Sequence, residues 1–153
     1  MKIQAAIVKQ AGLPFSIEEV DLQEPNPDEA LIKIVASGVC HTDEVVQMQF
    51  IPVPLPAVLG HEGSGIVEKV GTNVTEFQVG DHVGLSFGYC GKCHNCQSAK
   101  PYLCESLNEI CFGGAAHDGT KRLSQNDQEL SSFFAQSSFA TYAVVNEKKV
   151  WLK

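Results

Sequence analysis

The sequence has no clustered basic stripe and no long hydrophobic run. Its 11 Lys and Arg residues are outnumbered by 18 Asp and Glu residues, which gives a formal net charge of −7 at pH 7. A nucleic-acid surface needs clustered basic residues, so we expect no nucleic-acid partner. The short basic stretches Lys121-Arg122 and Lys148-Lys149 are expected to be solvated surface. Residues 1–20 contain only the short apolar run Ala5 to Val8, which predicts neither a secretion signal nor a membrane span. We therefore expect a protein of the reducing cytoplasm with no membrane partner.

The sequence also lacks internal repeats, low-complexity tracts and a Gly-x-Gly-x-x-Gly string that opens a strand–turn–helix unit. The nearest string, GHEGSG at 60–65, has the wrong glycine spacing for a dinucleotide-binding loop. A nucleotide-binding Rossmann domain is therefore expected to be absent from residues 1–153. The length of 153 residues, 44% of them hydrophobic, predicts a single domain with one ordinary core.

Short stretches rich in β-branched residues, separated by proline and glycine, predict β-strands over residues 3–9, 15–22, 29–37, 63–71, 77–86 and 139–146. A short helix is expected to start near Cys40, with Thr42 as a possible cap. Residues 113–137 show no periodicity and predict a loop with one helical turn at 127–134. Many short strands with few helices indicate a mainly β, barrel-like domain.

Four cysteines occur in the run YCGKCHNCQSAKPYLC, where two residues separate each of the first three and seven precede the fourth: Cys90, Cys93, Cys96 and Cys104. Tight Cys-x-x-Cys turns place thiolates about 2.3 Å from a shared cation, and a closed shell of four sulfurs leaves no position for substrate. The spacing therefore predicts a structural zinc held in a lobe at about 88–107.

A disulfide framework is the alternative interpretation of these cysteines. Three cysteines at two-residue gaps crowd one another, and no oxidising compartment is indicated for this chain. His94 lies inside the loop but is expected to be solvated, because four thiolates already complete the shell. We therefore expect reduced cysteines that coordinate zinc.

Three further residues have side chains that are good zinc ligands and lie beside glycine-containing turns: Cys40, His61 and Glu62. Alone, each is weak evidence, because an isolated cysteine is most often a small buried hydrophobe and an isolated histidine is most often structural. Together with the four-cysteine loop, they suggest a second metal site.

The collinear order GVCHTDE, GHEGSGIVEKVG, VGDHV and CGKCHNC with a distant cysteine resembles the zinc-containing alcohol dehydrogenases of the medium-chain dehydrogenase/reductase family. The resemblance covers nearly the whole chain. It is closest to the aryl-alcohol (benzyl-alcohol) dehydrogenase branch, through LSFGYCGKC and CFGGAAHDG. It implies that residues 1–153 form the N-terminal GroES-like catalytic domain of such an enzyme, a partly open β-barrel with short helices and an inserted zinc-binding loop.

The resemblance also implies a role for each site residue. Cys40 and His61 would bind the catalytic zinc, with Glu62 beside it as an alternating or outer carboxylate. Asp43 would orient the imidazole of His61. Thr42 would accept a hydrogen bond from the substrate hydroxyl and begin the path by which its proton leaves. For His41, the resemblance implies a position near the pyrophosphate of NAD or NADP.

The implied reaction is oxidation of a primary alcohol, aromatic or allylic, to its aldehyde by hydride transfer to NAD(P). In the family, a third zinc-binding cysteine follows the strand that here ends in VVNEKKVWLK, and Cys111 is not placed to replace it. We therefore expect these 153 residues alone to be inactive and the longer enzyme to be a homodimer or homotetramer. A zinc-stapled scaffold or binding module without chemistry is the competing hypothesis.

Overall fold

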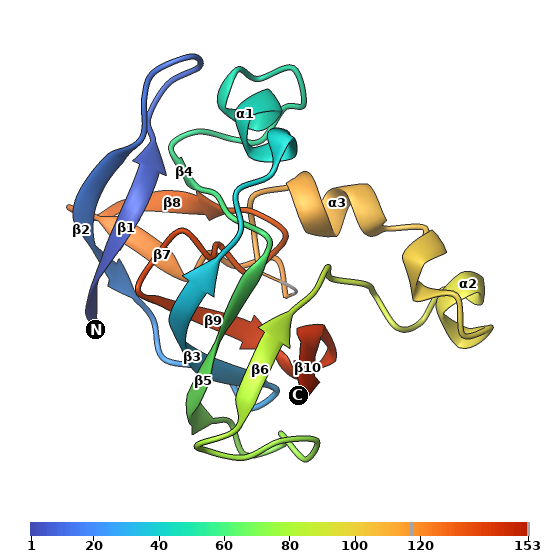
Figure 1. Ribbon diagram of the computed structural model, residues 1–153. Helices are drawn as coiled ribbons and strands as arrows, with labels where there is room; N and C mark the ends of the chain where they lie inside the picture. Colours follow the sequence, from blue (N-terminus) through green and yellow to red (C-terminus); the bar gives the residue numbers. More distant parts are fainter. Residues whose placement is uncertain (117, 153) are drawn as a thin grey trace.

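A computed structural model describes residues 1–116 and 118–152, and the chain is mainly β (Figure 1). Five strands close a barrel in the order β1-β2-β7-β8-β4. All the neighbouring strands for which a pairing is given are antiparallel except β4 and β8, which run parallel. The barrel strands are β1 (Lys2–Val8), β2 (Ser16–Leu22), β4 (Ala57–Val58), β7 (Leu123–Gln125) and β8 (Gln128–Ser132).

The other strands form a five-stranded sheet in the order β10-β6-β5-β3-β9. Its longest pairing joins β3 to β5, and two register shifts interrupt the ladder near Leu31 and Ile34. The structure thus contains the barrel that the sequence predicts, as a closed barrel, together with this separate sheet. The sheet strands are β3 (Glu29–Ser37), β5 (Gly63–Val70), β6 (His82–Leu85), β9 (Tyr142–Asn146) and β10 (Val150–Leu152).

The helices are short, and those labelled in Figure 1 lie at the periphery of the barrel and the sheet. α1 follows β3 directly, whereas α2 and α3 lie on the long excursion between β6 and β7. None of the helices in the described ranges combines the length and the apolar character that a bilayer crossing demands. They are α1 (His41–Gln47), α2 (His94–Gln97), η1 (Pro101–Leu103), α3 (Leu107–Phe112) and η2 (Glu147–Lys149).

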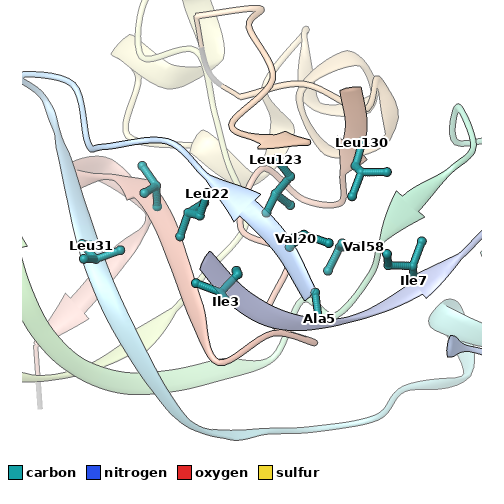
Figure 2. Close-up of a cluster of buried hydrophobic side chains, with 10 residues drawn as sticks. Ile3, Ala5, Ile7, Val20, Leu22, Leu31, Val58, Leu123 and Leu130 are labelled. Atoms are coloured by element: carbon teal, nitrogen blue, oxygen red, sulfur yellow. The ribbon is translucent and has the colours of Figure 1, made fainter. Parts of the chain in front are cut away.

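Alternation along the strands builds the barrel core. In β1 the side chains of Ile3, Ala5 and Ile7 are buried, because successive residues of a strand point to opposite faces. Figure 2 shows them gathered with Val20 and Val58 in the space that the strands enclose. Burying each large aliphatic side chain stabilises the fold by about 1.5–3 kcal/mol. This core is the rigid frame to which the loops are attached.

A second buried cluster lies beneath α1 and beside the loop that follows β4. Phe133 and Leu59 are fully buried in it, together with Val46 from the inner face of α1. The partly buried rings of Phe112 and Phe134 pack against the same cluster. α1 and the segment 133–134 are therefore fixed to one apolar base.

Three sequence expectations were wrong. Residues 127–134 are not a helical turn, because β7 and β8 form a hairpin there through Asn126 and Asp127, whose φ angles are +49° and +63°. The cap of α1 is Cys40 rather than Thr42. Arg122, expected as solvated surface, is only 7% exposed and donates two hydrogen bonds to Glu29.

Candidate functional site

The four-cysteine lobe is built from two tight turns. Cys93 caps the short helix α2, which carries Cys96, and Cys104 follows η1. Backbone N–H groups close these turns, because the Cys90 N–H donates to Cys104 Sγ at 3.3 Å and the Cys93 N–H donates to Cys90 Sγ at 3.3 Å. All four Sγ atoms lie within 4.8 Å of one another. The lobe therefore gathers, in one place, the four sulfurs that the spacing predicts.

The sulfur separations fit a zinc ion better than a disulfide. The Sγ atoms of Cys90 and Cys96 lie 3.9 Å apart. A tetrahedron with Zn–S bonds of about 2.3 Å separates its sulfurs by about 3.8 Å, whereas a disulfide needs about 2.05 Å. No disulfide is formed by the six cysteines, all of which belong to the described ranges. The donor set therefore fits a closed zinc site.

The four thiols differ in acidity. Backbone N–H groups of Lys92 and Cys93 lower the pKa of Cys90 to about 6. Those of Glu105 and Cys96 lower the pKa of Cys93. Burial raises the pKa of Cys96 to about 12, so its proton is strongly held without a cation. A divalent cation that displaces these protons would complete the cluster, and its binding would therefore weaken as the pH falls.

The remaining loop residues are not part of this cluster. His94 is exposed on α2 and does not belong to the group of four donors. Cys111 is buried in α3, at 1% exposure, and it belongs to neither donor group found in the part of the chain that the structure describes. That neither residue ligates the metal stays a prediction.

A second group of donors forms where α1 begins and where the chain leaves β4. Cys40 is the N-cap of α1, and His61 with Glu62 follows Gly60. Gly60 has a φ of +89°, and a Cβ on it would meet Phe139, so the turn that presents His61 requires glycine. One donor atom from each of Cys40, His61 and Glu62 lies within 4.8 Å of the other two.

Asp43 holds the two ligand-bearing segments together. Its Oδ2 accepts from the Cys40 N–H at 3.1 Å, and its Oδ1 accepts from the Gly60 N–H at 3.1 Å. The same Oδ1 lies 3.3 Å from Nδ1 of His61. Because an ionised carboxylate only accepts, this contact places the imidazole proton on Nδ1 and leaves Nε2 as the metal donor. Asp43 is 1% exposed, so the arrangement is shielded from water.

Glu62 stands on the solvent side of this group. Its Oε1 lies 4.0 Å from His61 Nε2, and its side chain is 49% exposed. Tetrahedral ligands with bonds of about 2.1 Å would lie about 3.4 Å apart, so the carboxylate needs to move by about half an ångström to share a cation with His61. A Cβ at Gly38 would overlap Glu62 Oε2, so glycine leaves room for that carboxylate.

Two neighbours of Cys40 differ in their surroundings. Cys40 Sγ–H donates to Thr42 Oγ1 at 3.4 Å, which places that hydroxyl beside the sulfur ligand. The side chain of His41 is 81% exposed, and its Nδ1 lies 3.1 Å from Glu44 Oε2. Thr42 therefore borders the donor group, and His41 points to the outside of α1.

Two aromatic residues at the site were not singled out from the sequence. Phe133 packs edge-on against the His61 ring with centroids 5.3 Å apart, and Phe134 stacks on it at 4.8 Å and 27°. They fall in the stretch without periodicity, where no motif marks them. The only available sequence cue was the pair of adjacent aromatic residues in an otherwise polar segment.

The comparisons with known proteins agree with this geometry. The family model of the alcohol dehydrogenase GroES-like domain matches residues 26–153. Geraniol dehydrogenase of Castellaniella defragrans is 49% identical over 146 residues, which cover 94% of this chain and 39% of that protein. The chain therefore belongs to the alcohol dehydrogenase GroES-like domain family.

Two solved structures share the fold closely. Benzyl alcohol dehydrogenase from Acinetobacter calcoaceticus is 48% identical with a TM-score of 0.94, over 100% of this chain and 41% of that one. An alcohol dehydrogenase zinc-binding domain protein from Burkholderia ambifaria is 46% identical with a TM-score of 0.95, over 99% of this chain and 42% of that one. The chain spans about two fifths of the length of these relatives, and the resemblance to zinc alcohol dehydrogenases is confirmed.

Proposed function

We propose that residues 1–153 are the N-terminal catalytic domain of a zinc-dependent alcohol dehydrogenase, with a structural zinc lobe at about 88–107. The observation that carries this proposal is the meeting of Cys40, His61 and Glu62, whose donor atoms lie within 4.8 Å of one another. A catalytic zinc site keeps an open position beside its protein ligands. The exposed side of Glu62 is where substrate would enter.

Zinc bound at this site would supply Lewis acidity, which makes an alcohol easier to deprotonate and polarises an aldehyde carbonyl. The chain's own residues prepare the site. Asp43 keeps the proton of His61 on Nδ1, so that Nε2 is free to donate its electron pair. The N–H groups of Cys40 and Gly60 hold the Asp43 carboxylate in place for that task.

Thr42 is proposed as the residue that takes the substrate proton. Its hydroxyl lies 3.4 Å from Cys40 Sγ, so an alcohol oxygen beside that sulfur would be within its reach. A hydroxyl both accepts and donates, and Thr42 can therefore receive the proton and pass another one on to the cofactor ribose or to water.

We propose NAD or NADP as the hydride acceptor, with His41 near its pyrophosphate. The exposed imidazole of His41 on the outer side of α1 supports this position. The sequence has no Gly-x-Gly-x-x-Gly loop, so residues 1–153 alone would transfer no hydride. The longer enzyme would be a homodimer or a homotetramer.

A primary aromatic or allylic alcohol is the proposed substrate. The names of two relatives support this class, because geraniol is an allylic alcohol and benzyl alcohol is an aromatic one. The aromatic rings of Phe133 and Phe134 beside His61 make the neighbourhood of the site apolar, which suits a substrate of this kind.

The experiment that tests the proposal measures alcohol oxidation by the longest protein that includes residues 1–153. Benzyl alcohol and geraniol serve as substrates, and NAD and NADP serve as hydride acceptors. Cys40→Ser is expected to abolish turnover, whereas His94→Gln, a change in the exposed loop histidine, should leave it intact. A scaffold module predicts no turnover with either acceptor and no second metal. Thr42→Ala should lower kcat while leaving the zinc content unchanged.

A further inference from the structure

The ring of His61 is held between two aromatic side chains. Phe134 stacks on one face at a centroid distance of 4.8 Å, and Phe133 meets the ring edge-on at 5.3 Å with an interplanar angle of 88°. The side chain of His61 is 11% exposed, so its orientation is set by these neighbours and by Asp43. The contact from Nδ1 to Asp43 measures 3.3 Å, beyond the usual N–H···O range of about 2.7–3.2 Å, so by itself it holds the ring only weakly.

The backbone that presents Phe134 is strained. Phe134, Ala135 and Ser137 have φ angles of +52°, +49° and +54°, a region that residues other than glycine seldom occupy. Such conformations persist where the surrounding structure enforces them, and they concentrate at functional sites. The stacked position of Phe134 is therefore not simply the relaxed conformation of this loop.

Hydrogen bonds tie the strained turn to the strand that leads to His61. Ser137 Oγ donates to the Val58 carbonyl at 2.8 Å and accepts from the Phe133 N–H at 3.0 Å. The next residue, Ser138, donates its N–H to the Gly60 carbonyl at 3.0 Å. The turn and the His61 loop are therefore bonded to each other, and these hydrogen bonds hold Phe134 over the imidazole.

We propose that Phe134 is a positioning residue for the catalytic zinc, because its stacked ring sets the plane of the His61 imidazole and so aims Nε2 at the cation. This inference rests on the proposed function for its metal, but the orientation of the imidazole is measurable without metal at the Cys40–His61 site. Asp43 selects the nitrogen that carries the proton, and Phe134 selects the direction in which the other nitrogen points.

The variants Phe134→Leu and Phe134→Tyr test this role. Leucine is apolar and, like phenylalanine, has no special tolerance for positive φ, so Phe134→Leu removes the stacked ring and changes little else. Phe134→Tyr keeps the ring. Phe112→Leu is the matched control, because Phe112 packs against both Phe133 and Phe134, with centroids 5.8 and 5.4 Å apart, from the far end of α3. A role in packing alone predicts similar effects for Phe112→Leu and Phe134→Leu.

The first readout is the Nδ1–H signal of His61 in ¹⁵N NMR of the chain that holds zinc at the four cysteines only, and the second is the affinity for Co²⁺ at the Cys40–His61 site. In Phe134→Leu the imidazole can turn away from Asp43, so we expect loss of the slowly exchanging Nδ1–H signal and a second Co²⁺ that binds about tenfold more weakly, at the lower end of the range found when groups that orient a metal ligand are removed. Phe134→Tyr and Phe112→Leu should retain both. Unchanged signal and affinity in Phe134→Leu, or an equal loss in Phe112→Leu, would overturn the proposal.

The two proposals fail in different ways. A wild-type chain that binds a single Co²⁺, at the four cysteines, contradicts the proposed function, while loss of the Nδ1–H signal in Phe134→Leu still shows that Phe134 orients the imidazole. If wild type and Phe134→Leu both bind a second Co²⁺, and bind it with the same affinity, the catalytic metal site is supported and the role of Phe134 is refuted.

Discussion

Asp43 Oδ1 lies 3.3 Å from Nδ1 of His61, although the two residues are 18 positions apart in the sequence. The carboxylate belongs to the first turn of α1 and the imidazole to the loop after β4, so the contact joins the two segments that carry the proposed catalytic ligands. It fixes the tautomer of the histidine and also holds the two segments together.

Replacing Asp43 with asparagine tests this contact. An amide has one acceptor oxygen and an NH₂ group, so it leaves at least one of the three N–H donors facing another donor. We expect the second zinc to bind about 10–100-fold more weakly and the free energy of unfolding to fall by about 1–3 kcal/mol. Competition with a chromophoric chelator measures the affinity. The zinc of the four cysteines serves as the internal control, and equal weakening at both sites would show a general loss of fold instead.

Cys93→Ser tests the division of roles between the two metal sites. Because binding of a structural zinc contributes directly to folding, loss of one sulfur should lower the free energy of unfolding by several kcal/mol, on the order of half or more of a small domain's stability. Thr42→Ala, at the other site, should change it by less than about 1 kcal/mol. Urea titration measures both. Similar midpoints for the two variants would contradict this division.

The buried ion pair of Arg122 and Glu29 predicts strong non-additivity. Arg122 donates to both carboxylate oxygens of Glu29, at 3.1 and 3.0 Å, and the two side chains are 8% and 6% exposed. Arg122→Met leaves a buried carboxylate without its cation and should cost about 3–5 kcal/mol. The double variant with Glu29→Gln should cost less than the sum of the two single changes. Denaturant unfolding of all four proteins completes the cycle, and strict additivity would argue against the pair.

The lowered pKa of Asp118 predicts that the folded chain loses some stability in acid. Burial alone would raise its pKa, but hydrogen bonds from Thr120 and Arg122 outweigh it and lower the pKa from 3.8 to about 2. Because the folded pKa is depressed, the contribution to stability is present above the unfolded value and is lost as the pH falls from about 4 to about 2. Asp118→Asn should flatten the acid limb of the stability profile. Its side chain is 41% exposed, so the effect should be small and should shrink with added salt.

The sequence predicts long and regular elements better than short, non-local ones. The strand expected at 29–37 matches β3, because β-branched residues fill it and turn residues flank it. The hairpin of β7 and β8 was missed, since β7 has three residues, too few to show alternation. β4 has two residues in a proline-spaced connector, and it is defined by pairing with β1 and β8, which no local pattern reveals.

The site shows the same limit. The cysteine spacing alone predicts the closed cluster, because its ligands are local in the chain. The second group needed the family resemblance, since Cys40 and His61 are weak evidence separately. Phe134 could not be predicted, because its place over His61 depends on the strained turn at 134–137 and on the hydrogen bond from Ser137 to Val58.

Native mass spectrometry of the zinc-loaded chain, before and after a mild chelator, tests the central claim most directly, because the mass reports zinc ions and disulfides together. We predict two zinc ions before treatment and one afterwards, with all cysteines free of disulfide bonds, since a closed shell of four sulfurs exchanges its metal more slowly than a site with an open position. A metal-free chain whose mass shows cystines, or two zinc ions that leave together, would contradict one sealed and one accessible site.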